Sequence, residues 1–201
     1  MSNFTDFFPA AAGGGGGGIP KYQDFTSSGT FTPTQALIDK GGRVSYFIVG
    51  GGEKGRFWSG YGAFGGAGGQ VKMGYATVTN TTGCAVTIGA GGSSSEGADG
   101  GNSSVAFNSA GGTAVTASGG SGEAGAGNGS YPGGYVYSGT SSRMKASSAH
   151  SGVLGYGAGG SGYENATSIA AGVSGGPANS GFGGTRYSDG ASGFVRITWH
   201  E

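Results

Sequence analysis

Two glycine-rich stretches have the spacing that binds dinucleotides. GYGAFG at residues 60–65 and GYGAGG at residues 155–160 match the pattern G-x-G-x-x-G. That chemistry requires the glycines to follow a parallel strand and to open a helix, so that backbone N–H groups can hold a pyrophosphate. Neither stretch has this setting, and a chain with 52 glycines among 201 residues produces such matches by chance. The sequence therefore predicts no nucleotide site.

The sequence also lacks the residue patterns typical of hydrolytic enzymes and of metal sites. The two histidines, His150 and His200, are not accompanied by a G-x-S-x-G elbow, and Cys84 is the only cysteine. Ten acidic residues are spread along the chain, and no pair is singled out for glycosidase chemistry. We therefore expect no enzyme, no metal site and no cofactor. Cys84 opens an apolar stretch and is expected to be a small buried side chain.

Alternating apolar and polar residues predict the strands that would position any functional loop. The stretches with this pattern are Asp24–Thr32, Arg43–Val49, Gln70–Thr79, Cys84–Gly89, Ser104–Asn108, Thr113–Ala117 and Gly193–Trp199. In the last stretch the even-numbered residues fall on one face and the odd-numbered residues on the other. Only Thr34–Lys40 has helical character, for one or two turns.

Glycine dominates the composition, and it is concentrated between the predicted strands. Each glycine in a regular element costs roughly 0.5–1 kcal/mol relative to alanine, so the fold must need bare backbone. Collagen is excluded because a strict Gly-X-Y period is absent. Zero net charge and 11% aromatic residues argue against disorder. The same neutrality predicts no nucleic-acid partner, and no apolar run is long enough for membrane insertion.

Short runs repeat glycine at every third position, as at residues 62, 65 and 68, at 119, 122 and 125, and at 157 and 160. This period favours threefold helices of the polyproline II type, which make no internal hydrogen bonds and can pack side by side through lateral bonds. The phase breaks after two or three repeats, so several short helices are expected. The predicted fold is mainly β, with almost no α-helix. It is a sandwich-like framework with packed glycine-rich loops, partly polyglycine II helices, in one domain over residues 21–201.

Residues 1–20 form a separate unit ahead of this domain. An aromatic patch at Phe4, Phe7 and Phe8 precedes the six glycines of Gly13–Gly18. We interpret the unit as a docking peptide followed by a flexible linker, with an unstructured terminus as the alternative. Because the first residues lack the basic region of a secretory signal, we expect synthesis in the cytoplasm without a signal peptide.

Several pieces of the sequence, in their order, resemble the glycine-rich domain of bacteriophage tail-fibre and adhesin proteins over about residues 22–201. These pieces are FTSSGTFTP at 25–33, VSYFIVGGG at 44–52, GGAGG at 65–69, AVTIGAGG at 85–92, NSSVAF at 102–107, the GGxG blocks and GASGFVRITW at 190–199. The resemblance implies a virion protein of the tail tip or fibre that recognises a protein or polysaccharide on the host cell surface. It also implies that Phe4, Phe7 and Phe8 attach the domain to another tail or baseplate protein. A homo-oligomer such as a trimer is compatible with it.

Two stretches interrupt the glycine pattern, Glu53–Tyr61 and Tyr131–Leu154, and they are the candidate receptor-binding loops. Aromatic and arginine side chains are the usual anchors of binding surfaces, and arginine and lysine pair with phosphate or carboxylate. The candidate residues are Arg56, Phe57, Trp58, Tyr61, Tyr131, Tyr135, Tyr137, Arg143, Lys145 and His150. The alternative is that these rings pack back over the glycine helices and seal the domain.

Two further functions are compatible with the sequence. A structural component of the tail tip would use the same glycine-rich domain as a spacer or cap, without touching a receptor. An ice-binding protein would need a flat face built on a sustained three-residue period, and the broken phase argues against it.

Overall fold

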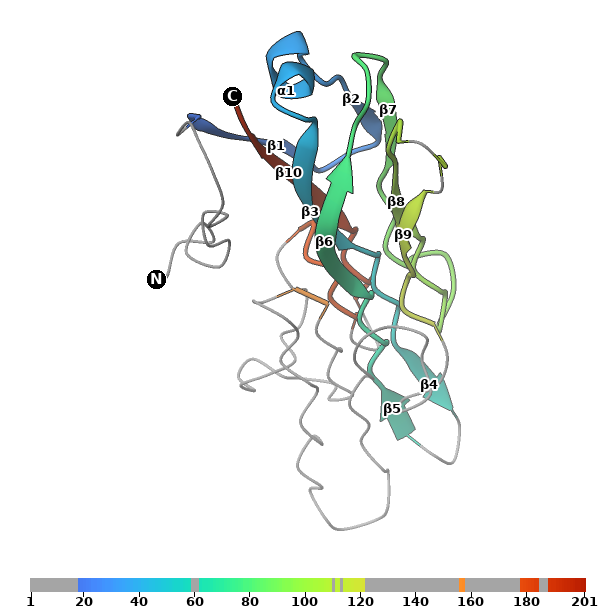
Figure 1. The fold of residues 1–201 in the computed structure, drawn as a ribbon. Coiled ribbons are helices and arrows are strands. Elements are labelled where there is room, and N and C mark those ends of the chain that lie inside the picture. Colours follow the sequence, from blue (N-terminus) through green and yellow to red (C-terminus); the bar gives the residue numbers. More distant parts are fainter. Residues whose placement is uncertain are drawn as a thin grey trace.

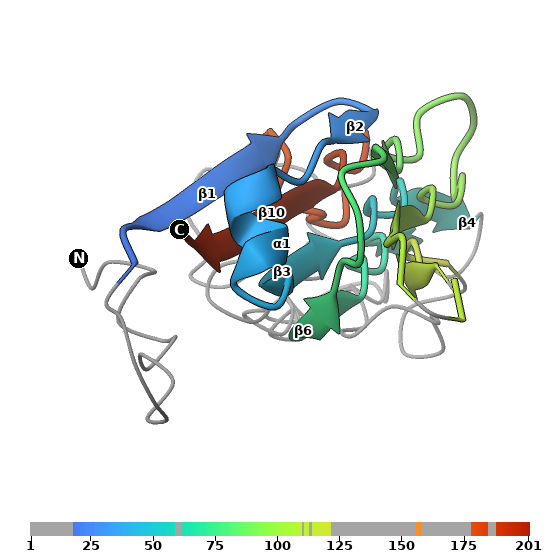
Figure 2. The same ribbon diagram turned by 45° about the horizontal axis from the view of Figure 1, so that its top comes forward.

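The computed structural model describes residues 18–58, 62–109, 111–112, 114–121, 156–157, 178–184 and 188–201. Its upper part in Figure 1 is a sandwich of two four-stranded antiparallel sheets, also seen in Figure 2. The first sheet consists, in order, of β1 (Pro20–Phe25), β10 (Phe194–His200), β3 (Arg43–Val49) and β6 (Val71–Thr77). The second sheet consists, in order, of β2 (Gly29–Phe31), β7 (Cys84–Thr87), β8 (Ser103–Ala106) and β9 (Val115–Ala117). The mainly β prediction is confirmed.

The core forms between the two sheets because alternate residues of the strands are apolar. Val195 lies opposite both Phe25 and Ile48, so these side chains share the inner face of the first sheet. The inner face of the second sheet contributes Phe31, Cys84, Val86, Val105 and Ala117 to the same cluster. Cys84 is fully buried, and desolvation raises the pKa of its thiol. The side chain is therefore the small buried residue that its sequence context predicted.

One predicted strand is wrong in its extent. Asp24–Thr32 was expected to be a single strand, but β1 ends at Phe25 and β2 begins at Gly29, and the two belong to different sheets. The chain bends between them, and Ser28 is tied to the second sheet because its hydroxyl accepts the N–H of Ile88 at 2.9 Å. The segment thus carries the chain from one sheet to the other.

The short helix α1 (Gln35–Asp39) closes one end of the sandwich and agrees with the helical turn predicted at Thr34–Lys40. The Thr34 hydroxyl caps it by accepting the N–H of Leu37 at 3.2 Å, while the Leu37 side chain enters the core. The helix ends where Gly41 and Gly42 take φ values of 90° and 66°, which reverse the chain into β3.

Below the sandwich the strands continue into packed glycine-rich segments, which we call the glycine lattice. Its central segment, Gly50–Lys54, follows β3 directly. Hydrogen bonds connect it to six neighbours, residues 66–70, 89–92, 98–101, 118–120, 181–184 and 190–193. Five of these neighbours extend β6, β7, β8, β9 and β10, so both sheets lead into the same lattice.

The central segment bonds to its neighbours with a three-residue period. The donor and acceptor pairs are Gly50 to Gln70, Gly51 to Gly101, Gly52 to Ala191, Glu53 to Ala67 and Lys54 to Ala98, at N···O distances of 2.8–2.9 Å. Three successive residues thus donate to three different neighbouring segments, and the fourth residue donates again to the first of these segments. The carbonyls of Gly51, Gly52 and Glu53 accept from three further neighbours. This is the pattern of polyglycine II helices packed side by side, as the sequence predicted.

Glycine is required here because the neighbouring backbones pack so closely that a Cβ atom would overlap them. A Cβ atom on Gly51 would overlap the carbonyl oxygen of Ala90, and one on Gly52 would overlap that of Phe182. The glycine periods read from the sequence locate the lattice only in part. Gly62 lies in a strand, and Gly157 lies in a bend with a φ of 66°. Contact with a neighbouring backbone, more than period alone, determines where glycine is needed.

The two ends of the domain meet at the α1 end of the molecule. The N–H of Ile19 donates to the carbonyl of Glu201 at 2.7 Å, and the N–H of Glu201 donates back to Ile19 at 3.2 Å. The hairpin of β4 (Arg56–Trp58) and β5 (Gly62–Phe64) lies at the opposite end, beyond the lattice (Figure 1). The two ends of the domain and the distal hairpin therefore lie on opposite sides of the lattice.

Candidate functional site

The distal hairpin contains the first group of candidate receptor-binding residues. Arg56, Phe57 and Trp58 form β4, and they pair with Phe64, Ala63 and Gly62 of β5. The structure describes only the backbone of these strands, and Tyr61 lies outside the described residues. The prediction that these side chains bind a receptor therefore stays a prediction. Their strand lies at the far end of the lattice from the chain ends (Figure 1).

The beginning of the predicted loop Glu53–Tyr61 needs correction. Glu53 belongs to the central segment of the lattice, and its side chain is only 2% exposed. Its Oε2 atom accepts the N–H of Ala67 at 2.9 Å, while its own N–H donates to the Ala67 carbonyl at 2.8 Å. The carboxylate is an additional acceptor beside the backbone bonds, and Lys54 donates to the Ala98 carbonyl at 2.9 Å, so the lattice continues two residues into the predicted interruption.

Lys54 completes the base of the hairpin. Its ammonium group donates to the carboxylate of Asp189 at 2.8 Å and to the carbonyl of Ser93 at 3.0 Å. The side chain therefore ties the central segment to two surrounding parts of the chain. Gly55 also accepts the N–H of Gly97, at 3.2 Å, and β4 begins at the next residue.

The other candidate residues lie outside the described part of the chain. For the second loop they are Tyr131, Tyr135, Tyr137, Arg143, Lys145 and His150. The attachment candidates Phe4, Phe7 and Phe8 also lie outside it. Their roles therefore remain predictions.

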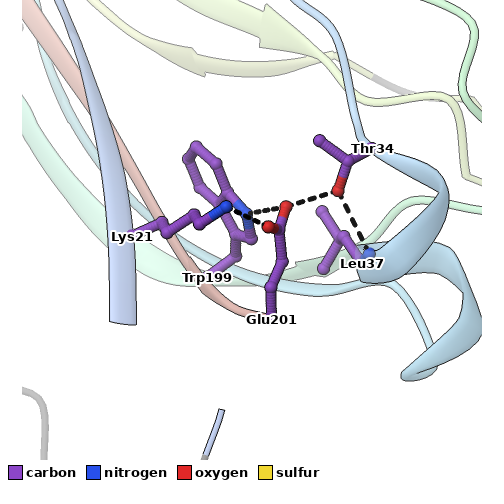
Figure 3. A network of polar contacts seen from close by, with 5 residues as sticks. All are labelled: Lys21, Thr34, Leu37, Trp199 and Glu201. Atoms are coloured by element: carbon purple, nitrogen blue, oxygen red, sulfur yellow. Dashed lines mark hydrogen bonds and ion pairs between the residues drawn. The ribbon is translucent and has the colours of Figure 1, made fainter. Parts of the chain in front are cut away.

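Where the two ends of the domain meet, the Glu201 side chain is the centre of a network of hydrogen bonds (Figure 3). Its carboxylate accepts from the ammonium of Lys21, the hydroxyl of Thr34 and, at 3.0 Å, the indole N–H of Trp199. The bonds from Lys21, Thr34 and Trp199 lower the pKa of Glu201 to about 2. The network joins β1, the cap of α1 and the end of β10.

Glu201→Gln should destabilise the protein in a pH-dependent way. The folded pKa of this carboxyl lies below its ordinary value of 4.5, so its ionised form stabilises the fold above about pH 4.5. That contribution is lost as the pH falls toward about 2. Thermal melts of both proteins should therefore differ at pH 7 and converge near pH 2. A difference in melting temperature that is as large at pH 2 as at pH 7 would contradict this assignment.

A second surface, which the sequence did not indicate, lies on the outer face of the first sheet. Tyr22, Met73 and Tyr75 are 63%, 50% and 57% exposed there. The strand register places Tyr22 opposite Thr198, Thr198 opposite Ser45 and Ser45 opposite Tyr75. Three inter-strand steps separate the two tyrosines by about 14 Å. The alternation in Gln70–Thr79 indicated one face of β6, but its neighbours on β1 and β10 follow only from the pairing.

Arginine side chains hold both tyrosine rings. The Arg43 guanidinium lies 4.6 Å from the ring centroid of Tyr75, and the Arg196 guanidinium lies 4.9 Å from that of Tyr22. Arg196 also donates twice to Asp24, each time at 2.6 Å. We call the residues Tyr22, Arg43, Ser45, Met73, Tyr75 and Thr198 the open face.

The part of the same sheet nearer the lattice is covered. The ring of Tyr156 packs on Phe47, with ring centroids 5.0 Å apart, and stacks on Phe194, with centroids 5.6 Å apart. Phe47, Val49 and Phe194 form a buried cluster, and Val71 and Tyr156 pack against it. The open face is therefore bounded on its lattice side by a small apolar cluster.

Within the described residues, no group of three histidine, cysteine, aspartate or glutamate side chains is placed to hold a metal ion. No helix in the described part of the chain is long and apolar enough to cross a membrane. Comparisons with protein families and with curated proteins gave no match to this sequence.

Proposed function

We propose that the protein is a phage tail-fibre or tail-tip adhesin that recognises a bacterial surface receptor without chemical reaction. The observation that carries the proposal is the position of the distal hairpin, which lies at the opposite end of the molecule from the two ends of the domain. Ile19 and Glu201, the two ends of the domain, pair with each other at one end of the molecule, and the β4–β5 hairpin lies at the other. A domain attached to a virion through residues 1–17 can then present its distal end to the cell.

The glycine lattice supports the same function through rigidity. The five residues of Gly50–Lys54 donate backbone hydrogen bonds to three separate segments of the chain, and a side chain on Gly51 or Gly52 would overlap a neighbouring backbone. A hairpin built on this base loses little conformational entropy when it docks, which favours affinity. Several copies on one virion would strengthen weak individual contacts.

The receptor-binding loops are testable by competition. Purified protein should bind intact cells of the strain that the encoding phage infects, and should block adsorption of that phage. Trp58→Ala with Tyr61→Ala, and separately a deletion of residues 131–150, should each weaken cell binding at least about tenfold, as for anchor residues of an interface. Labelled protein counted on cells by flow cytometry measures the effect. Lys40→Ala, exposed beside α1, is the control and should bind like the unchanged protein.

The same assay separates the alternatives. If the unchanged protein neither binds cells nor blocks adsorption, the adhesin proposal fails and a structural role in the tail remains. If cell binding survives both loop variants, the protein is an adhesin whose site lies elsewhere.

A further inference from the structure

The open face has the composition of a protein–protein interface. Interfaces are enriched in aromatic residues, methionine and arginine relative to the rest of a protein surface. Tyr22, Met73 and Tyr75 are three of the four large hydrophobic side chains exposed among the described residues, and Arg43 lies beside them. The face therefore concentrates the side chains that a protein partner would bury.

Charge argues against a second copy of this chain as that partner. Among the described residues, Arg43 is the cation of the open face, and beside the face Asp24 is already held by Arg196 through two hydrogen bonds. No described carboxylate pairs with Arg43. A second copy meeting this face with its own would therefore offer Arg43 no free carboxylate from the described residues of the face. The partner that fits Arg43 is a different protein with an acidic surface.

Strand addition at the edges of this sheet is also disfavoured. Lys21 lies on edge strand β1 opposite Trp199, and Lys72 lies on edge strand β6 opposite Ile48. Both lysines are therefore on the inner side of an edge strand, where a charge discourages pairing with another strand. A partner would meet the face rather than the edge.

The described part of the chain begins with Gly18 at a corner of this face. The carbonyl of Gly18 lies 3.3 Å from Nδ1 of His200, at the end of β10, and Tyr22 follows four residues later. The sequence has six glycines at residues 13–18, and six residues reach at most about 20 Å even when fully extended. One partner could therefore contact the aromatic patch of residues 4–8 and the open face together.

We propose that the open face docks onto the carrier, the virion protein that residues 1–17 attach to, through an acidic and partly apolar surface of that protein. This inference rests on the proposed function. It adds a second contact to the peptide, and two linked contacts hold more tightly than either alone because the second forms at high effective concentration. It also leaves the distal hairpin free for the receptor.

The test is reconstitution of virions that lack this chain. Such particles are mixed with purified full-length protein, separated by sedimentation and assayed for bound protein. Arg43→Glu and Tyr75→Ser should each weaken incorporation at least about tenfold, because charge reversal or loss of an aromatic anchor at an interface has effects of this size. Lys72→Glu is the matched control, with the same charge change on the opposite face of the sheet. It should incorporate normally.

Cell binding and melting temperature are measured on the same variants. The inference holds if Arg43→Glu and Tyr75→Ser lose incorporation while they melt and bind cells like the unchanged protein. It is overturned if both variants incorporate normally, or if Lys72→Glu loses as much as Arg43→Glu. It is also overturned if the unchanged protein self-associates in analytical ultracentrifugation and Arg43→Glu abolishes that association. Failure of the unchanged protein to bind cells would instead count against the adhesin function.

Discussion

Gly52→Ala should lower the free energy of unfolding by about 3–5 kcal/mol, among the largest effects expected of a single methyl group. Gly52 lies at the middle of the central segment, and its new Cβ atom would overlap the backbone carbonyl of Phe182. Neither backbone can move freely. Gly52 donates to Ala191 and accepts from Gly92, both at 2.8 Å, so a shift that relieves the overlap weakens these bonds too.

Denaturant unfolding followed by circular dichroism measures this effect. Gly29→Ala is the matched control because it makes the same chemical change in β2, where the new Cβ atom would lie in ordinary contact, 3.6 Å from the ring of Phe25. Removing a glycine from a strand should leave stability within about 1 kcal/mol, on the stabilising side. Equal effects of the two substitutions would show that close backbone packing is not what demands glycine at position 52.

Glu53→Ala should be the second severe substitution, with a loss of about 2–4 kcal/mol in the free energy of unfolding. The carboxylate accepts the N–H of Ala67, a residue that is 1% exposed. Alanine would leave this buried N–H without its acceptor and would open a cavity inside the lattice. Glu53→Gln retains a carbonyl oxygen of similar position and should lose less.

Lys54→Ala is the neighbouring control. The Lys54 ion pair with Asp189 involves a carboxylate whose side chain is 56% exposed, so its loss should cost under about 1 kcal/mol. Chemical denaturation of the three variants gives the comparison. If Glu53→Ala proves as mild as Lys54→Ala, the Glu53 carboxylate is not a component of the lattice.

The sandwich could be predicted from the sequence because its strands alternate apolar and polar residues. In β10, Val195 and Ile197 enter the core while Arg196 faces outward, as their alternation indicated. The division of Asp24–Thr32 into two strands could not be predicted, since alternation continues through the bend. The second part pairs with β7, and Ser28 also bonds to Ile88, 60 residues away, so the change of sheet depends on partners distant in the sequence.

The sequence predicted the type of backbone helix in the lattice, but only some of the residues that form it. Period-three glycines indicated threefold helices, yet the central segment includes Glu53 and Lys54, which look like an interruption when composition alone is considered. Glu53 can be buried in the lattice because its carboxylate accepts the N–H of Ala67, which belongs to another part of the chain. Similarly, the pairing of Tyr22 with Arg196 depends on strand order, which a single sequence does not reveal.

The hydrogen bonds of the central segment also constrain when the domain can form. Gly51 bonds to Gly101, Gly52 to Ala191, and the carbonyl of Glu53 accepts from Gly184. Contacts between residues so distant along the chain make folding slow. During translation the central segment emerges long before Gly184 and Ala191, so its set of hydrogen bonds stays incomplete until synthesis has passed these residues. A nascent chain cannot build this domain piece by piece, so the lattice closes only when nearly the whole polypeptide is available.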